Sequence, residues 1–315
     1  MSEGRNFAGY RGAPPEMRWP NGAGLAVSVV VNIEEGAELS LTAGDARNEH
    51  IYEAVEQVEG APDPCMESHF EYGPRAGWPR IRDALRARGV SATLNACGRA
   101  LDATPWIAQE AAADRHEVAA HGWRWERHAG MDEATERRAI DRTVDAITRH
   151  AGTPPLGWHT RSATSTRTRD LLVEHGGFLY DSNAYNDDIP YTVETAHGPH
   201  VVLPYAFDSN DMRFYNNGGF VFAEDFARYC NAAFDRLLKE SAHAPRMLSV
   251  GLHTRIIGRP ARIGGLEAFL DHALKAQSVW FATRADIARA WRKAVGLPDW
   301  AARPSPAGFA EQTLQ

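Results

Sequence analysis

The sequence contains few cysteines, and no two of them form a familiar metal or disulfide motif. Its 315 residues include only three, Cys65, Cys97 and Cys230, which are widely separated. Because there is no Cys-x-x-Cys pair, the sequence indicates neither a thiolate zinc site nor a framework of disulfides. We expect the three thiols to be buried apolar groups in a reducing compartment.

The chain also lacks long apolar runs and a strong excess of charge of one sign. No uninterrupted apolar stretch is long enough to cross a bilayer, and residues 1–22 contain no apolar core like that of a signal peptide. The formal net charge is -7, with acidic and basic residues interspersed, which argues against a nucleic-acid partner. We therefore expect a cytoplasmic protein that binds neither nucleic acid nor membranes.

What the chain does have is an alternation of predicted strands and helices. Hydrophobic residues make up 43% of the sequence, enough for a sizeable core. Short β-branched or apolar runs predict strands, and longer amphipathic stretches predict helices. This order favours a parallel sheet, either open or closed into a barrel. The predicted strands are 25–32, 90–97, 116–122, 155–160, 178–182, 246–254 and 278–283; helices are predicted over 75–89, 104–115, 132–152, 167–177, 224–240 and from Thr283 onward.

Two segments interrupt this alternation. Residues 33–74 form an insertion after the first strand, and residues 183–222 form a second one that contains YNDDIPY and DSNDMRFYNNGGF. Long irregular connections in a compact domain are usually functional loops, so we expect both to border the site. Residues 297–315 read as a poorly ordered tail.

Polar side chains follow five of the predicted strands. In parallel α/β folds the chemistry gathers at the carboxyl ends of the strands. Any one of these residues alone is better explained as a solvated turn or a hydrogen-bonded core residue, but their joint occurrence favours an active site. They are Asn32, Glu34 and Glu35 after the first strand, His121, then His159 and Arg161, then Asp181 and Ser182, and finally His253 and Arg255.

The stretch HGWRW, residues 121–125, has the histidine of a metal motif without its partner. A second histidine four residues on would share a helical face with His121, but that position holds Trp125, which cannot bind a metal. In a helix His128 would lie roughly 10 Å along the axis, too far to share one ion.

Taken together, these residues resemble the polysaccharide deacetylases of the NodB-homology superfamily. In that family a first-strand acidic motif supplies a base and a metal ligand, His-x-x-x-His supplies two more ligands, and a later histidine protonates the leaving group. NIEEG, HGWRW and GLHTR stand at the corresponding places here. More closely, the chain resembles the metal-independent allantoinase branch. This resemblance rests on GYRGAPP, WPNGAGLAVSVVVNIEEG, MESHFEYGPRAGWPRI, HEVAAHGWRW, GGFLYDSNAYNDDIPY, VLPYAFDSNDMRF and MLSVGLHTRIIGRPAR.

The resemblance implies a fold and an assembly. The expected fold is a distorted parallel (β/α) barrel of the NodB type with fewer than eight strands, formed by one domain over residues 1–296 with its N-terminal segment wrapping the outside. The expected assembly is a homotetramer. Two departures concern the pocket: GWHTRSATS differs from the allantoinase pattern, and Ile33 replaces an aromatic residue. The acidic motif also aligns two ways, so Glu34 matches either the base or the metal ligand.

The resemblance also implies a function, the ring-opening hydrolysis of a cyclic amide such as allantoin or a related hydantoin or imide, a step of purine catabolism. Without a tightly bound metal, a carboxylate must activate the water. The expected base is Glu34 or Glu35. His121 is expected to orient the water or to donate a hydrogen bond to the oxyanion, and His253 is expected to protonate the leaving nitrogen. No cofactor is expected, beyond a weakly held divalent metal such as zinc. The substrate-binding residues expected are Asn32, Trp125, His159, Arg161 and Arg255.

Two alternatives remain open at this point. The first is a metal-dependent N-deacetylase that acts on chitin-like or peptidoglycan-like polysaccharides. The second is a catalytically inactive barrel that binds a carbohydrate or a ureide. Retention of Glu34, Glu35, His121 and His253 together argues against the inactive barrel, because a pure binding module does not need all four.

Overall fold

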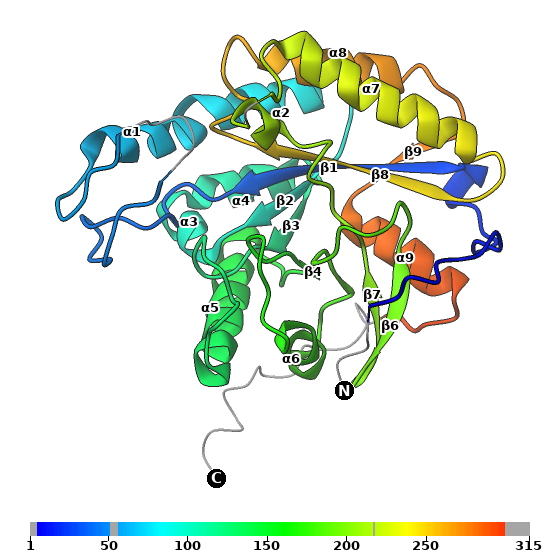
Figure 1. Cartoon of the computed structure of the whole chain (residues 1–315), viewed down its shortest axis with the longest axis horizontal. Coiled ribbons are helices and arrows are strands. Elements are labelled where there is room, and N and C mark those ends of the chain that lie inside the picture. The colour runs from blue at the N-terminus through cyan, green and yellow to red at the C-terminus, as the bar shows by residue number, and fades with distance from the viewer. Residues whose placement is uncertain (1–4, 51–55, 217, 300–315) are drawn as a thin grey trace.

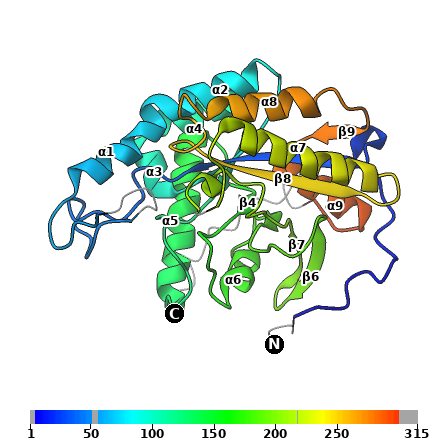
Figure 2. The same cartoon turned by 45° about the horizontal axis from the view of Figure 1, so that its top comes forward.

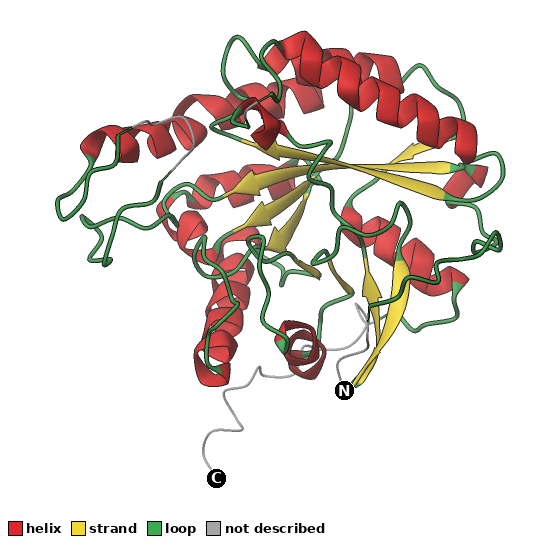
Figure 3. Cartoon of the chain, in the orientation of Figure 1, coloured by secondary structure: helices red, strands yellow, loops and turns green. Residues whose placement is uncertain are grey.

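Strand β1 (Leu25–Ile33) is the longest strand of a curled sheet with helices on its outside (Figures 1 and 3). The structure is a computed structural model that describes residues 5–50, 56–216 and 218–299. β1 pairs in parallel along its whole length with β8 (Arg246–His253), and its last residues pair with β2 (Thr93–Ala96). All nine residues of β1 are buried, as expected for a β-branched run covered on both faces.

The sheet is mostly parallel and forms a half-barrel. Within the described residues, a continuous path of seven parallel strands has the order β7-β5-β4-β3-β2-β1-β8, and its curl confirms the distorted barrel of the NodB type. Off this path, one strand extends the β7 edge as an antiparallel hairpin, and a short one pairs in parallel with the first residues of β1. The remaining bounds are β3 (Glu117–Ala120), β4 (Gly157–Trp158), β5 (Tyr180–Asp181), the edge strand β6 (Tyr191–Thr195), β7 (Gly198–Val202) and β9 (Val279–Phe281).

Helices cover the convex side of the curl, with α2, α7 and α8 lying together over β1 and β8 (Figure 2). No helix in the described part of the chain is long and apolar enough to cross a membrane. The helices are α1 (Pro64–Tyr72), α2 (Trp78–Arg86), α3 (Gly98–Ala103), α4 (Pro105–Ala113), α5 (Glu133–Ala151), α6 (Thr168–His175), α7 (Ala223–Glu240), α8 (Ile263–Ala273) and α9 (Arg284–Ala294), with shorter helical turns at Pro20–Gly22, Gly73–Gly77 and Asp211–Phe214.

The two faces of the central strands differ in polarity. Successive side chains of a strand point to opposite faces. In β1, residues 25, 27, 29, 31 and 33 belong to the main hydrophobic core, whereas Ser28 and Asn32 alternate with them and are buried on the other face. In β8 the same alternation places Ser249 and His253 beside Ser28 and Asn32 in the paired register. The inside of the curl is therefore partly polar, and it leads to the ends of these strands.

The N-terminal segment runs along the outside of the sheet (Figure 1). The Arg18 guanidinium donates to the Ser241 carbonyl at 2.7 Å, and the Trp19 indole donates to the Arg246 carbonyl at 2.8 Å. The predicted domain limits stay a prediction, and most of the predicted tail, residues 300–315, lies outside the described residues.

Candidate active site

A cavity of about 90 Å³ lies at the carboxyl ends of β1, β3, β4 and β8. Eight of the nine residues predicted from the sequence line it; the ninth, Glu35, does not. Parallel strands bring these distant positions together because their carboxyl ends meet at one edge of the sheet. The eight are Asn32, Glu34, His121, Trp125, His159, Arg161, His253 and Arg255.

Glu34 is the most connected side chain of the cavity, and it is almost fully buried, with 1% exposure. One carboxylate oxygen accepts a hydrogen bond from Arg255 Nη1 at 2.7 Å. The other, Oε1, lies 3.3 Å from His121 Nε2 and 3.4 Å from His253 Nε2. Burial acts to raise the pKa of this carboxyl, but the charges of His253 and Arg255 outweigh it and hold the pKa well below its usual range. Glu34 is therefore ionised at neutral pH.

His253 has the opposite charge. Its Nδ1 donates to Asp211 Oδ1 at 2.6 Å, and its backbone amide donates to Asp211 Oδ2 at 2.7 Å. Burial acts to lower the pKa of the imidazole, but Glu34 and Asp211 outweigh it and raise the pKa to about 9. His253 thus holds a proton on Nε2 at neutral pH, next to an ionised carboxylate.

His121 and His159 form a stacked pair, with ring centroids 5.2 Å apart. A carbonyl oxygen can only accept, so His121 Nδ1, 2.5 Å from the His159 carbonyl, must carry a proton. That leaves His121 Nε2 to face Glu34. His159 Nδ1 likewise donates to the Ser182 carbonyl at 3.1 Å. Burial, together with the neighbouring His121, lowers the pKa of His159 well below its usual value, so its ring is neutral.

Glu35 points away from the cavity. Its carboxylate accepts from the Thr254 hydroxyl, from Arg255 Nη1 at 3.3 Å and from the Glu34 backbone amide at 3.2 Å. These bonds tie the end of β1 to the residues that follow β8. The structure therefore separates the two glutamates that the sequence left as equal candidates.

Trp125 lies between two arginines. The Arg161 guanidinium carbon is 3.4 Å from the centre of the indole ring, and the Arg255 guanidinium carbon is 5.0 Å from it. Arg161 also makes a two-bond ion pair with Glu49, at 2.9 and 3.0 Å, and donates to the Trp125 carbonyl at 2.8 Å. Both guanidinium groups are thus already paired with carboxylates.

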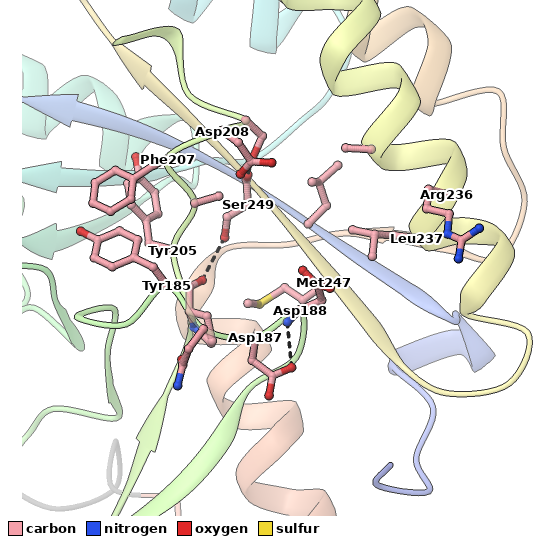
Figure 4. Close-up of a pocket in the computed structure, with 16 residues that line it drawn as sticks. Tyr185, Asp187, Asp188, Tyr205, Phe207, Asp208, Arg236, Leu237, Met247 and Ser249 are labelled. Atoms are coloured by element: carbon pink, nitrogen blue, oxygen red, sulfur yellow. Dashed lines mark hydrogen bonds between the residues drawn. The ribbon is translucent and has the colours of Figure 1, made fainter. Parts of the chain in front are cut away.

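A larger pocket of about 550 Å³ adjoins the cavity (Figure 4). Tyr185, Tyr205 and Phe207 line both spaces, and the rings of Tyr185 and Phe207 stack at 3.8 Å. The larger pocket does not include Glu34 or His253 in its lining. We therefore place the candidate site in the smaller cavity and regard the larger one as its neighbour.

Comparison with known proteins identifies relatives over most of this chain. A Schizosaccharomyces pombe protein described as a polysaccharide deacetylase is 35% identical over 313 residues, which cover 92% of this chain and 98% of that protein. The chain belongs to the polysaccharide deacetylase family. Residues 59–177 of this family member match the family's sequence profile. The Helicobacter pylori peptidoglycan deacetylase is 25% identical over 262 residues, 73% of this chain and 88% of that protein.

Solved structures of relatives share the fold of this family member. A Pseudomonas aeruginosa PAO1 protein described as a polysaccharide deacetylase is 43% identical, with a TM-score of 0.88 over 92% of this chain and 98% of that one. The PuuE allantoinase is 40% identical, also with a TM-score of 0.88, over 93% of this chain and 98% of that one. The second similarity is consistent with the allantoinase-like branch inferred from the motifs.

The residues of the cavity do not fit the metal that the deacetylase motifs imply. Trp125 stands where a second histidine ligand is expected, and the Glu34 carboxylate is paired with the Arg255 guanidinium, whose charge would repel a cation. In the part of the chain that the structure describes, no group of three or more His, Cys, Asp or Glu side chains could hold a metal ion. We derive no step through a metal, and metal independence stays a prediction.

Sequence reasoning missed several residues of the site in this family member. Asp211, which holds His253, lies in the second insertion within DSNDMRF, where no strand end pointed to it. Glu49 lies within the first insertion, and Tyr205 follows β7, a strand that the sequence did not predict. The only available signal was that both insertions are long and polar.

Proposed function

We propose that this family member hydrolyses the carbon–nitrogen bond of a small cyclic amide, with allantoin as the first candidate. The observation that carries the proposal is the contact between Glu34 Oε1 and His253 Nε2, at 3.4 Å in one buried cavity. It provides an ionised carboxylate beside a protonated imidazole, the two partners that water attack on an amide requires. Similarity to the PuuE allantoinase supports the cyclic amide as substrate.

The reaction follows from these two protonation states. A water molecule attacks the amide carbon while Glu34 takes one of its protons, so that hydroxide character develops only during the attack. The electron pair of the carbonyl bond moves to the oxygen, and a tetrahedral intermediate forms. When that intermediate collapses, the carbon–nitrogen bond breaks and His253 delivers its proton to the leaving nitrogen. His121, whose Nε2 lies 3.3 Å from Glu34, positions the carboxylate and the water.

The size of the cavity supports a small substrate. About 90 Å³ accommodates a compact ring in contact with the catalytic side chains, whereas a polymer would have to reach them from outside. His159, whose Nδ1 is bonded to the Ser182 carbonyl, presents its other ring nitrogen for the amide or ureido edge of such a ring. Arg161 and Arg255, which are already paired with glutamates, shape the wall and do not supply a free positive charge.

Turnover of purified protein tests the proposal. We expect ring opening of allantoin or hydantoin, with and without a chelator, and little deacetylation of chitin oligosaccharides. Glu34→Gln keeps the shape but removes the base, so it should lower the rate by about 10²–10⁴. Glu110→Gln is the matched control, because Glu110 accepts from the Trp78 indole outside the cavity. Near wild-type rates for Glu34→Gln, or deacetylation that requires added metal, would contradict the proposal.

A further inference from the structure

Tyr205 has a buried hydroxyl group whose role is not explained by the assignments above. It lies just beyond β7, is 7% exposed and lines the same cavity as Glu34 and His253. Its ring is 4.7 Å from that of His159, and Figure 4 shows it beside Tyr185 and Phe207. A tyrosine hydroxyl has one proton to donate and can accept hydrogen bonds on its lone pairs.

Both hydrogen bonds made by this hydroxyl are ones that it accepts. Asn32 Nδ2 donates to Tyr205 Oη at 3.1 Å, and Asn210 Nδ2 donates to it at 3.4 Å. Backbone groups fix the orientation of both amides. Asn32 Nδ2 also donates to the Leu252 carbonyl at 3.0 Å, and Asn210 Oδ1 accepts from the Met212 amide at 2.9 Å. Turning either amide over would set like groups against each other.

The proton of Tyr205 must therefore point elsewhere. No acceptor for it exists among the described residues, although a buried donor without a partner is costly. The direction of β8 is closed, because a Cβ atom at Gly251 would lie 2.3 Å from Oη. The cavity remains. Burial raises the pKa of this phenol, so the proton stays in place at any pH at which the site can work.

We infer that Tyr205 is a further catalytic residue, which donates a hydrogen bond to the oxyanion formed during amide hydrolysis. The inference rests on the proposed function. When water attacks, the carbonyl electron pair becomes a negative charge on oxygen, and a fixed donor directed into the cavity stabilises that charge without reorganisation.

The charged and imidazole donors around Glu34 are committed. Arg255 pairs with Glu34, and Arg161 pairs with Glu49. His253 keeps its proton for the leaving nitrogen, and His121 Nδ1 donates to the His159 carbonyl. Tyr205 is a buried side chain of the same cavity whose oxygen is fixed by two accepted hydrogen bonds, and Asn32 and Asn210 act as positioning residues that hold it.

The test is Tyr205→Phe, assayed on allantoin or whichever cyclic amide the wild type opens. This change keeps the ring against His159 and removes only the hydroxyl. Loss of one oxyanion donor should lower kcat by about 10²–10³ and leave KM nearly unchanged. The matched control is Tyr180→Phe, which removes a buried tyrosine hydroxyl that donates to Glu117 outside the cavity, at 2.9 Å. It should lower thermal stability and leave kcat near that of the wild type.

A second variant separates a structural role from a catalytic one. Replacing Tyr205 by 3-fluorotyrosine keeps the fold and the hydrogen bonds but makes the phenol a stronger donor, so kcat should equal or exceed the wild-type value. If Tyr205→Phe is folded and retains wild-type kcat while Glu34→Gln is inactive, the inference is wrong and the proposed function stands. The inference is also wrong if the fluorinated protein is folded but has lost its kcat. If the wild type opens no cyclic amide, both the proposed function and the inference about Tyr205 are wrong.

Discussion

At the scale of single residues, the site is a buried pair of opposite charges. Glu34 and His253 stabilise each other's charged form. Asp211 forms an ion pair with His253, and Arg255 forms one with Glu34. Each charge lowers the cost of burying the other, which is why both can stay ionised at 1% and 3% exposure. A base and an acid are therefore present together before any substrate arrives.

This pairing makes the pH dependence of kcat/KM predictable. Activity needs Glu34 ionised and His253 protonated, so the rate should fall as pH rises through about 9, where His253 loses its proton. The acid limb should lie below the ordinary range of a glutamate, because the pKa of Glu34 is lowered. Asp211→Asn removes one of the two carboxylates that raise the pKa of His253. Its pH–rate profile should show the alkaline limb at lower pH; an unmoved limb would mean that His253 is not the acid.

The ion pair between Arg161 and Glu49 gives a second prediction at this scale, because the carboxylate neutralises the guanidinium charge. Glu49→Gln should free the Arg161 guanidinium to bind an anionic ligand. The affinity for hydantoin-5-acetate, relative to that for uncharged hydantoin, should then increase by about tenfold or more, because hydrogen bonds to charged groups contribute about 1.5–3 kcal/mol. Calorimetric titration of both ligands measures the change. Glu174→Gln is the control, because it opens a similar two-bond pair with Arg137, at 3.0 and 2.8 Å, outside the cavity. An unchanged preference in Glu49→Gln would show that Arg161 does not face the ligand.

The sequence could predict the residues that stand directly after strands and little else of the site. Glu34, His121 and His253 were found because a parallel sheet gathers its strand ends. Glu35 was not distinguishable from Glu34, since one residue of register decides which side chain faces the cavity and which turns outward. Asp211 was missed because its position depends on how a long loop folds back over β8.

At the scale of elements, local signals predicted helices with clear ends. Helix α5 begins after Asp132, which caps it through the Thr135 amide, and ends at Gly152, whose φ of 79° is left-handed. Thr283, where the last predicted helix starts, caps α9 by accepting from the Asp286 amide. Thr104 does not cap α4, because its hydroxyl donates to the Ala100 carbonyl of the preceding helix α3.

Other elements were not predicted, and each has a physical reason. The first insertion contains α1 and the second contains the hairpin of β6 and β7, although both were taken as irregular. Helix α8 was also missed. It begins IGG, and two glycines in the first turn weaken any helix signal, but four of its side chains, those of Leu266, Phe269, Leu270 and Ala273, pack into the core. Tertiary burial therefore decided what local propensity could not.

Strand β8 provides the prediction at this scale. Gly251→Ala should push a methyl group against Tyr205 Oη and Asn210 Nδ2, 2.3 and 2.4 Å from the new Cβ. We expect a loss of about 1–3 kcal/mol in unfolding free energy, as for other overpacked sites, together with reduced kcat. Gly264→Ala on α8 meets nothing within 4 Å and should stabilise by about 0.4–1 kcal/mol, as at a compatible helical site. Denaturant unfolding and steady-state kinetics of both variants check this; equal stabilities would contradict the packing.

At the scale of the whole molecule, the parallel pairing of β1 with β8 explains why residues 34 and 253 meet. β1 and β8 are neighbours in space although 220 positions separate Asn32 from Leu252, whose carbonyl accepts from the Asn32 amide. The alternation of strands and helices was sufficient to predict this parallel arrangement. The openness of the barrel is not a local property, so local patterns could not predict it. That prediction came from the family resemblance, and the strand order confirms it.

The expected homotetramer is a prediction at this scale. It rests on the resemblance to the allantoinase-like branch and stays untested. Light scattering during size-exclusion chromatography should give four times the mass of one chain, independent of concentration in the micromolar range. A mass of one or two chains at all concentrations would set the prediction aside.

The position of Trp125 bears on how such an enzyme can evolve. With Arg161 and Arg255 packed against its indole and glutamates paired to both, the tryptophan is one member of an interdependent set. Reversion of that one position, Trp125→His, would return a ligand to a place still flanked by two guanidinium groups, so we expect no zinc uptake from it in a titration. Several linked substitutions would be needed, each harmful until the others were present. A single substitution at Trp125 would therefore not restore a metal site.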